Sequence, residues 1–189
     1  MMADGKERHF PRGTLFRIAE WYGMLPGKPN VGTKMLAVDI AKGVLQRDRE
    51  MRSLAMGRVQ DGPADPSIYA VENGQSIALD MEKAGVKWTR GDNSPGSRKN
   101  GWERMRKYFS ASLESRPEEP GLYVFDTCVD FIRTVPVLPR HKLKLDDIDS
   151  ASEDHIADEA RMRLLATPAP VWGSSRFGVY RPPSRVRAK

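Results

Sequence analysis

The chain has 189 residues, of which 39% are hydrophobic and 30% are charged, and a chain of this length can bury a sizeable core in one medium domain. No apolar run approaches the roughly 20 residues that cross a bilayer, and the first residues lack the apolar stretch of a signal peptide, so a membrane protein is not expected. Cys128 is the only cysteine, which argues against disulfides and a cysteine-based zinc site and favours a reducing cytoplasm.

The net charge of +6 is unevenly distributed along the chain. Residues 167–189 contain five basic residues and no acidic ones, which leaves 26 basic against 25 acidic residues in the rest. We therefore expect a domain over residues 1–166 and a basic, proline-rich, flexible tail over residues 167–189. The body is nearly neutral, so it would bind nucleic acid through local patches.

The predicted elements alternate between strands and helices. Dense β-branched and aromatic residues predict strands over 14–22, 86–89 and 121–127. Apolar residues at helical spacing predict helices over 33–51, 76–85, 102–113, 128–135 and 151–166, the last with Ser150 and Glu153 as a capping box. Residues 23–32 and 91–101 are predicted to be loops, and Gly62 and Pro63 limit any strand over 57–65. This alternation favours α/β layers around a central sheet.

The segment Gly27–Lys34 is superficially similar to a phosphate-binding loop. Its final residues are Thr33-Lys34, the reverse of the Lys-Ser/Thr order that such a loop requires. Pro29 also removes a backbone donor. An ordinary loop before a helix is the better interpretation.

Residues 146–159 are strongly acidic and contain no lysine or arginine. Asp154 and Asp158 are four residues apart, and His155 and Asp158 are three apart, so they are neighbours on a helix. A divalent cation with oxygen ligands would explain such a concentration of like charge, and a solvated acidic face at a helix start explains it as well. Asp65, between Ala64 and Pro66, is a second candidate ligand or a turn residue.

Basic residues gather around Trp102. They are Arg98, Lys99, Arg104, Arg106 and Lys107, opposed only by Glu103. Cations interleaved with an aromatic side chain suit a nucleic-acid backbone. A solvated helix face explains the pattern equally well.

Several stretches in order resemble the nuclease domain of the large terminase subunit of tailed bacteriophages. They are Arg12–Arg17 leading into Glu20–Gly23, then Ala64–Ile68, Asp92–Ser94 with Gly101-Trp102 beyond, Leu122–Cys128 and Glu153–Arg161. The resemblance covers roughly residues 10–166. It implies an RNase H-like α/β fold with a central mixed β-sheet flanked by helices, and metal-dependent cleavage of concatemeric double-stranded DNA during genome packaging.

The resemblance also implies roles for individual residues. Asp65 corresponds to a central catalytic acid and Asp158 to the last one, with Asp154 as an extra ligand and His155 as a supporting residue or ligand. The metal would be Mg²⁺ or Mn²⁺. The implied partners are double-stranded DNA, the terminase small subunit, the portal and the terminase ATPase domain, in the cytoplasm of a bacterial host.

One feature departs from the family pattern. The family's first catalytic aspartate lies on a strand upstream of the Arg-Gly region, and only about ten residues precede that region here. We therefore expect a domain truncated at its first strand, with weak or absent cleavage. Two alternatives stay open: a non-catalytic DNA-binding or packaging-assembly module, and another RNase H-like enzyme such as a resolvase or transposase.

Overall fold

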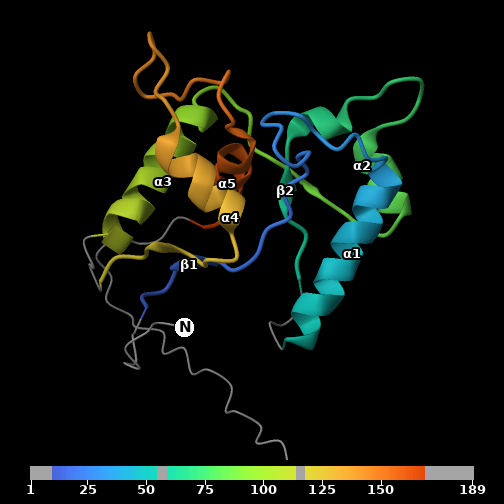
Figure 1. Cartoon of the computed structure of the whole chain (residues 1–189), viewed down its shortest axis with the longest axis horizontal. Helices are drawn as coiled ribbons and strands as arrows, with labels where there is room; N and C mark the ends of the chain where they lie inside the picture. The colour runs from blue at the N-terminus through green and yellow to red at the C-terminus, as the bar shows by residue number, and fades with distance from the viewer. Residues whose placement is uncertain (1–9, 55–58, 114–117, 169–189) are drawn as a thin grey trace, which may run out of the picture.

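The computed structural model describes residues 10–54, 59–113 and 118–168 of the chain (Figure 1). The five α-helices in these ranges are α1 (Ala37–Ser53), α2 (Ile77–Lys83), α3 (Ser97–Leu113), α4 (Val129–Thr134) and α5 (His155–Ala166). The strands are β1 (Leu15–Arg17), β2 (Pro63–Ala64), β3 (Thr89–Arg90) and β4 (Leu122–Val124), and two 3₁₀ helices are η1 (Pro66–Tyr69) and η2 (Val135–Val137).

The strands form two separate parallel pairs within the described ranges. Strand β1 pairs with β4, with Leu15 opposite Leu122, and β2 pairs with β3, with Pro63 opposite Thr89. The prediction of α/β layering is confirmed in its coarse form, while the expected central mixed sheet is replaced here by these two pairs. Proline has no N–H to donate, so Pro63 helps to keep β2 short.

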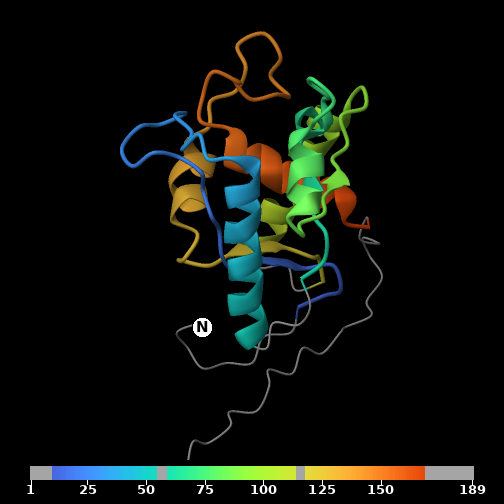
Figure 2. The same cartoon turned by 90° about the vertical axis from the view of Figure 1, so that its right-hand side faces the viewer.

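The described residues form two hydrophobic cores. The larger core packs α3, α4 and α5 on β4 and centres on Trp102, Tyr108, Phe131 and Leu164, all at most 3% exposed. The smaller core lies between α1 and α2 and buries Ala41, Met81 and Val86. Figures 1 and 2 show the resulting arrangement, with α1 and α2 to one side of the α3–α5 group.

All five predicted helices are present, with changed ends. Helix α2 begins after Ser76, whose hydroxyl accepts the Leu79 N–H, and it ends before Gly85, whose φ of 97° suits glycine. The loop predicted over 91–101 is wrong from residue 97 onward, because α3 begins at Ser97. The predicted capping box is also wrong, since α5 begins at His155 and Glu153 pairs with Arg133 instead.

Two further predictions concern membrane-spanning helices and the basic tail. None of the helices within the described ranges is long and apolar enough to cross a bilayer. The basic tail lies outside the described residues from position 169 onward.

Candidate functional site

Two aspartates follow the strands of the β2–β3 pair at the same edge. Asp65 directly follows β2 and Asp92 follows β3 after Gly91. Because the strands are parallel, both residues lie at the carboxyl edge of the pair, which is where α/β sheets carry their sites. Both residues are exposed.

The two aspartates have the same local geometry. A carboxylate oxygen of Asp65 accepts the Ser67 N–H at 2.8 Å, and one of Asp92 accepts the Ser94 N–H at 2.9 Å. Hydrogen bonding from these serines, through side chain and backbone, holds the pKa of each carboxyl below its ordinary value. Both are therefore negatively charged at neutral pH.

Sequence reasoning overlooked Asp92 as a site residue. The signal was present in the sequence, since Asp65-Pro-Ser67 and Asp92-Asn-Ser94 share an Asp-x-Ser pattern after a strand. Such a turn is common by itself. The pairing of β2 with β3 places the two Asp-x-Ser turns at the same edge, and no local sequence pattern predicts that pairing.

Helix α5 packs against this edge. A side chain at Gly91 would lie 2.9 Å from the Met162 sulfur and 2.8 Å from the Ala64 carbonyl oxygen, so glycine permits the close approach. The neighbouring Arg161 is 5% exposed, and its charge acts on both Asp65 and Asp92. Its Nε donates to Asp158 at 2.9 Å, while its Nη1 is buried and has no partner in the described part of the chain.

A single guanidinium binds three of the acidic residues. Arg98 on α3 contacts Asp147 at 2.7 Å, Asp154 at 3.2 Å and Asp158 at 3.0 Å. Asp147 also accepts the Trp102 indole N–H at 2.9 Å. The basic helix and the acidic segment, which the sequence suggested as two separate sites, thus form one ion cluster.

This cluster bears on the predicted metal site. Asp154 and Asp158 are brought together, but their oxygens are bound to arginine, and Asp65 is bound to Ser67. Across the described ranges, no group of three or more His, Cys, Asp or Glu side chains is arranged to hold a metal ion. A metal ion would have to displace arginine from Asp154 and Asp158 to use them as ligands.

The predicted DNA-contacting residues are mostly engaged within the chain. Lys99 pairs with Asp146 at 2.6 Å and Lys107 with Glu103 at 2.9 Å, while Arg104 donates to the Thr167 carbonyl at 2.8 Å. Arg106 is exposed on α3. To contact DNA phosphates, Lys99, Arg104 and Lys107 would therefore have to leave their present partners, whereas Arg106 is exposed.

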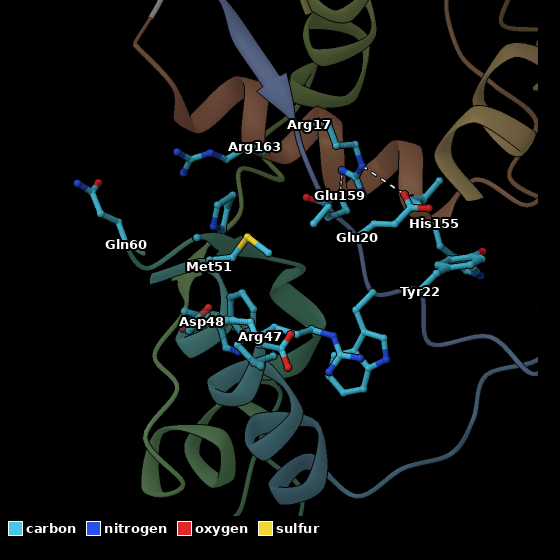
Figure 3. Close-up of a pocket in the computed structure, with 18 residues that line it drawn as sticks. Arg17, Glu20, Tyr22, Arg47, Asp48, Met51, Gln60, His155, Glu159 and Arg163 are labelled. Carbon is cyan, nitrogen blue, oxygen red and sulfur yellow. Dashed lines mark hydrogen bonds and ion pairs between the residues drawn. The ribbon is translucent and has the colours of Figure 1, made fainter. Parts of the chain in front are cut away.

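His155 borders the ion cluster, with its Nδ1 3.9 Å from Asp154 Oδ1. Its side chain is 66% exposed and lines a cleft of about 740 Å³, together with Arg17, Glu20, Tyr22 and other residues (Figure 3). Glu20 is occupied here, because it accepts the Asp130 N–H at 2.6 Å at the start of α4. Arg17 is likewise bound, to Glu159 at 2.6 Å.

None of the family models, curated proteins and solved structures compared with this chain matches it. The functional interpretation therefore rests on the residues and their geometry.

Tyr22, on the rim of this cleft, gives a testable pH dependence. Burial and the neighbouring Glu153 carboxylate raise the pKa of Tyr22 from 10.0 to about 12. The unfolded chain loses this proton first as the pH rises above 10, so the stabilising contribution of Tyr22 should decline between pH 10 and about 12. Denaturation at stepped pH should show this decline, and Tyr22→Phe should remove it. A Tyr123→Phe control should retain it, and an unchanged slope in Tyr22→Phe would contradict the assignment.

Proposed function

We propose that this chain is a DNA-processing domain of the phage terminase large-subunit nuclease type, with an RNase H-like arrangement. The observation that carries the proposal is the placement of Asp65 and Asp92 at the carboxyl edge of two parallel strands, with β2 in contact with the helix that bears Asp158. The matching stretches of sequence contribute these residues in the family's order. The substrate is concatemeric double-stranded DNA.

The further assignments belong to the same proposal. The cofactor would be Mg²⁺ or Mn²⁺, and the partners would be the terminase small subunit, portal and ATPase domain in the bacterial cytoplasm. Asp65 and Asp92 would present ionised carboxylates to DNA at the carboxyl edge of the β2–β3 pair. Arg161 would hold Asp158 in place. Among the described residues, these carboxylates do not form a group of three that could hold a metal ion.

Weak cleavage follows from this geometry. Both Asp158 oxygens already accept hydrogen bonds from arginine, so a cation would have to displace a guanidinium. In a plasmid-nicking assay with Mn²⁺, we expect slow nicking or none. Any metal-dependent nicking should disappear in Asp65→Asn and in Asp92→Asn, and persist in the control Asp61→Asn, which alters an exposed aspartate on the amino side of β2.

The same preparation tests the proposal at the level of binding. A labelled DNA duplex should bind the full chain with an affinity that falls steeply with salt. Absence of duplex binding at low salt would overturn the proposal. Robust nicking that Asp65→Asn or Asp158→Asn abolishes would instead show that a complete metal site forms, and that the expected weak cleavage is wrong.

The ion cluster favours a second candidate, a non-catalytic DNA-binding or packaging-assembly module. In that case Arg98 neutralises three carboxylates for structural reasons. Duplex binding would then be independent of metal, and no nicking would depend on Asp65 or Asp92. Metal-dependent nicking that Asp65→Asn or Asp92→Asn removes would support the nuclease domain, whereas duplex binding without such nicking would support the second candidate.

A further inference from the structure

The segment between η2 and α5 projects from the molecule as a narrow loop. It is the orange loop that extends past the ends of the helices in Figures 1 and 2. Its two arms are tied together, because Arg140 and Ile148 form an antiparallel bridge and the Asp149 N–H donates to the Pro139 carbonyl at 2.9 Å. The loop therefore has a defined shape, with residues 142–146 at its tip.

A histidine side chain braces this tip. The Nδ1 atom of His141 accepts the N–H groups of Leu143 and Lys144, each at 3.1 Å. The Asp147 N–H donates to the Lys144 carbonyl at 2.8 Å and closes the turn. In this braced turn Leu143 is 89% exposed. Burial of the leucine against a partner would therefore be favourable through the hydrophobic effect.

Cations flank the exposed leucine. Lys142 and Lys144 are its neighbours in the chain, and Arg140 lies on the adjoining arm. All three are exposed, and none of them forms an ion pair within the described ranges. Asp146, the acidic residue of the tip, is already paired with Lys99 at 2.6 Å. The tip therefore presents an apolar centre with a positive rim.

The base of the loop is fixed beside the candidate site. Asp147 accepts hydrogen bonds from Arg98 and from the Trp102 indole. The same guanidinium contacts Asp158 at 3.0 Å. Helix α3, which carries Arg98, begins shortly after Asp92. A duplex that reaches either aspartate would therefore pass close to the loop.

Two lysines on either side of one leucine suit the minor groove of DNA. Alternate residues of a chain lie at most about 7 Å apart, which matches the minor-groove width of about 6 Å better than the major-groove width of about 12 Å. Lys142 and Lys144 would then reach phosphates of opposite strands, with Leu143 directed at the bases between them. Apolar side chains inserted in this way unstack a base step and kink the duplex.

An anionic membrane is a poorer match for the same tip. Its apolar part consists of Leu143 and Leu145, which are 89% and 65% exposed. Even a single acyl chain, which buries more apolar surface than two leucines, gives only marginal membrane binding. The observations therefore favour DNA as the partner.

We propose that this loop enters the minor groove of duplex DNA bound at the candidate site, with Leu143 as a wedge between base pairs and Lys142 and Lys144 on the flanking phosphates. The wedge bends the duplex where it meets the carboxyl edge of the β2–β3 pair. This inference rests on the proposed DNA-processing function, and it adds how the duplex is held and deformed.

The test measures the deformation of DNA by the full chain. A duplex labelled at both ends reports bending by energy transfer, and a 2-aminopurine base within it reports unstacking. The chain should bend the duplex by roughly 20–90° and raise the 2-aminopurine fluorescence. Both signals should be lost in Leu143→Ala and retained in Leu143→Met. Leu36→Ala truncates a leucine that is 71% exposed just before α1, and as the matched control it should leave both signals unchanged.

The lysines have a separate signature. Lys142→Ala and Lys144→Ala should each reduce the steepness of log affinity against log salt by about 1, whereas Leu143→Ala should leave the steepness unchanged. If the duplex binds and is bent equally by Leu143→Ala, this inference alone is overturned. Absence of duplex binding at low salt would overturn both the inference and the proposed function. Binding to phosphatidylserine vesicles that Leu143→Ala weakens, with no effect of that substitution on DNA, would overturn the inference in favour of a membrane.

Discussion

Replacing Arg98 with alanine should lower the free energy of unfolding by about 2–4 kcal/mol. The arginine is the shared partner of Asp147, Asp154 and Asp158, and the Asp154 side chain is only 7% exposed. Removing the guanidinium would leave three neighbouring carboxylates facing one another, one of them deprived of water. It would also remove one of the two side-chain contacts that tie Asp147 to α3 and leave the Trp102 indole N–H as the other. Chemical denaturation of the purified chain measures the change.

The adjacent residue provides the control. Lys99 forms an ion pair with Asp146, and both side chains are more than 60% exposed. Because exposed pairs contribute little, Lys99→Ala should leave the free energy of unfolding almost unchanged. Arg98→Lys should recover only part of the loss, since an ammonium cannot reproduce the three-way contact of a planar guanidinium. Equal effects of Arg98→Ala and Lys99→Ala would show that the ion cluster does not stabilise the fold.

The same cluster shows what sequence reasoning reached and what it missed. Local composition singled out both Arg98 and the Asp154–Asp158 segment, because density of like charge is visible along the chain. Their contact joins residues 56 and 60 positions apart, which no local spacing encodes. The acidic segment therefore suggested a metal, whereas the folded chain supplies arginine as the counter-ion.

A similar limit applies to the secondary structure. Periodicity predicted all five helices, since each has apolar residues that recur at helical spacing, although α3 was expected to begin only at Trp102. The start of α3 was missed because Ser97 to Gly101 is polar and contains a glycine, the composition of a loop. Sheet pairing was also beyond local patterns, because β2 and β3 have two residues each and are joined only by a crossover through α2.

Gly101, the glycine within α3, leads to a second stability prediction. Its sign is opposite to the usual stabilising effect of replacing a helix glycine with alanine. In the interior of a helix, glycine costs about 1 kcal/mol relative to alanine, so Gly101→Ala should be stabilising if only the helix mattered. Here an added Cβ would overlap Arg161 Cγ and lie 2.8 Å from Cδ. These atoms belong to the buried stem of Arg161, which Asp158 holds at the other end. The side chain therefore has little freedom to withdraw.

We expect Gly101→Ala to destabilise the chain by about 1–3 kcal/mol, as overpacking in a core does. Asn100→Ala, one residue earlier on the exposed face of α3, should instead stabilise by a few tenths of a kcal/mol through helix propensity alone. Thermal and chemical denaturation of the two variants should therefore give changes of opposite sign. If the same displacement of Arg161 disturbs Asp158, the losses in Gly101→Ala and Arg98→Ala should be non-additive, because both substitutions act on one carboxylate. A stabilising Gly101→Ala would mean that α3 and α5 do not approach as closely as Gly101 permits.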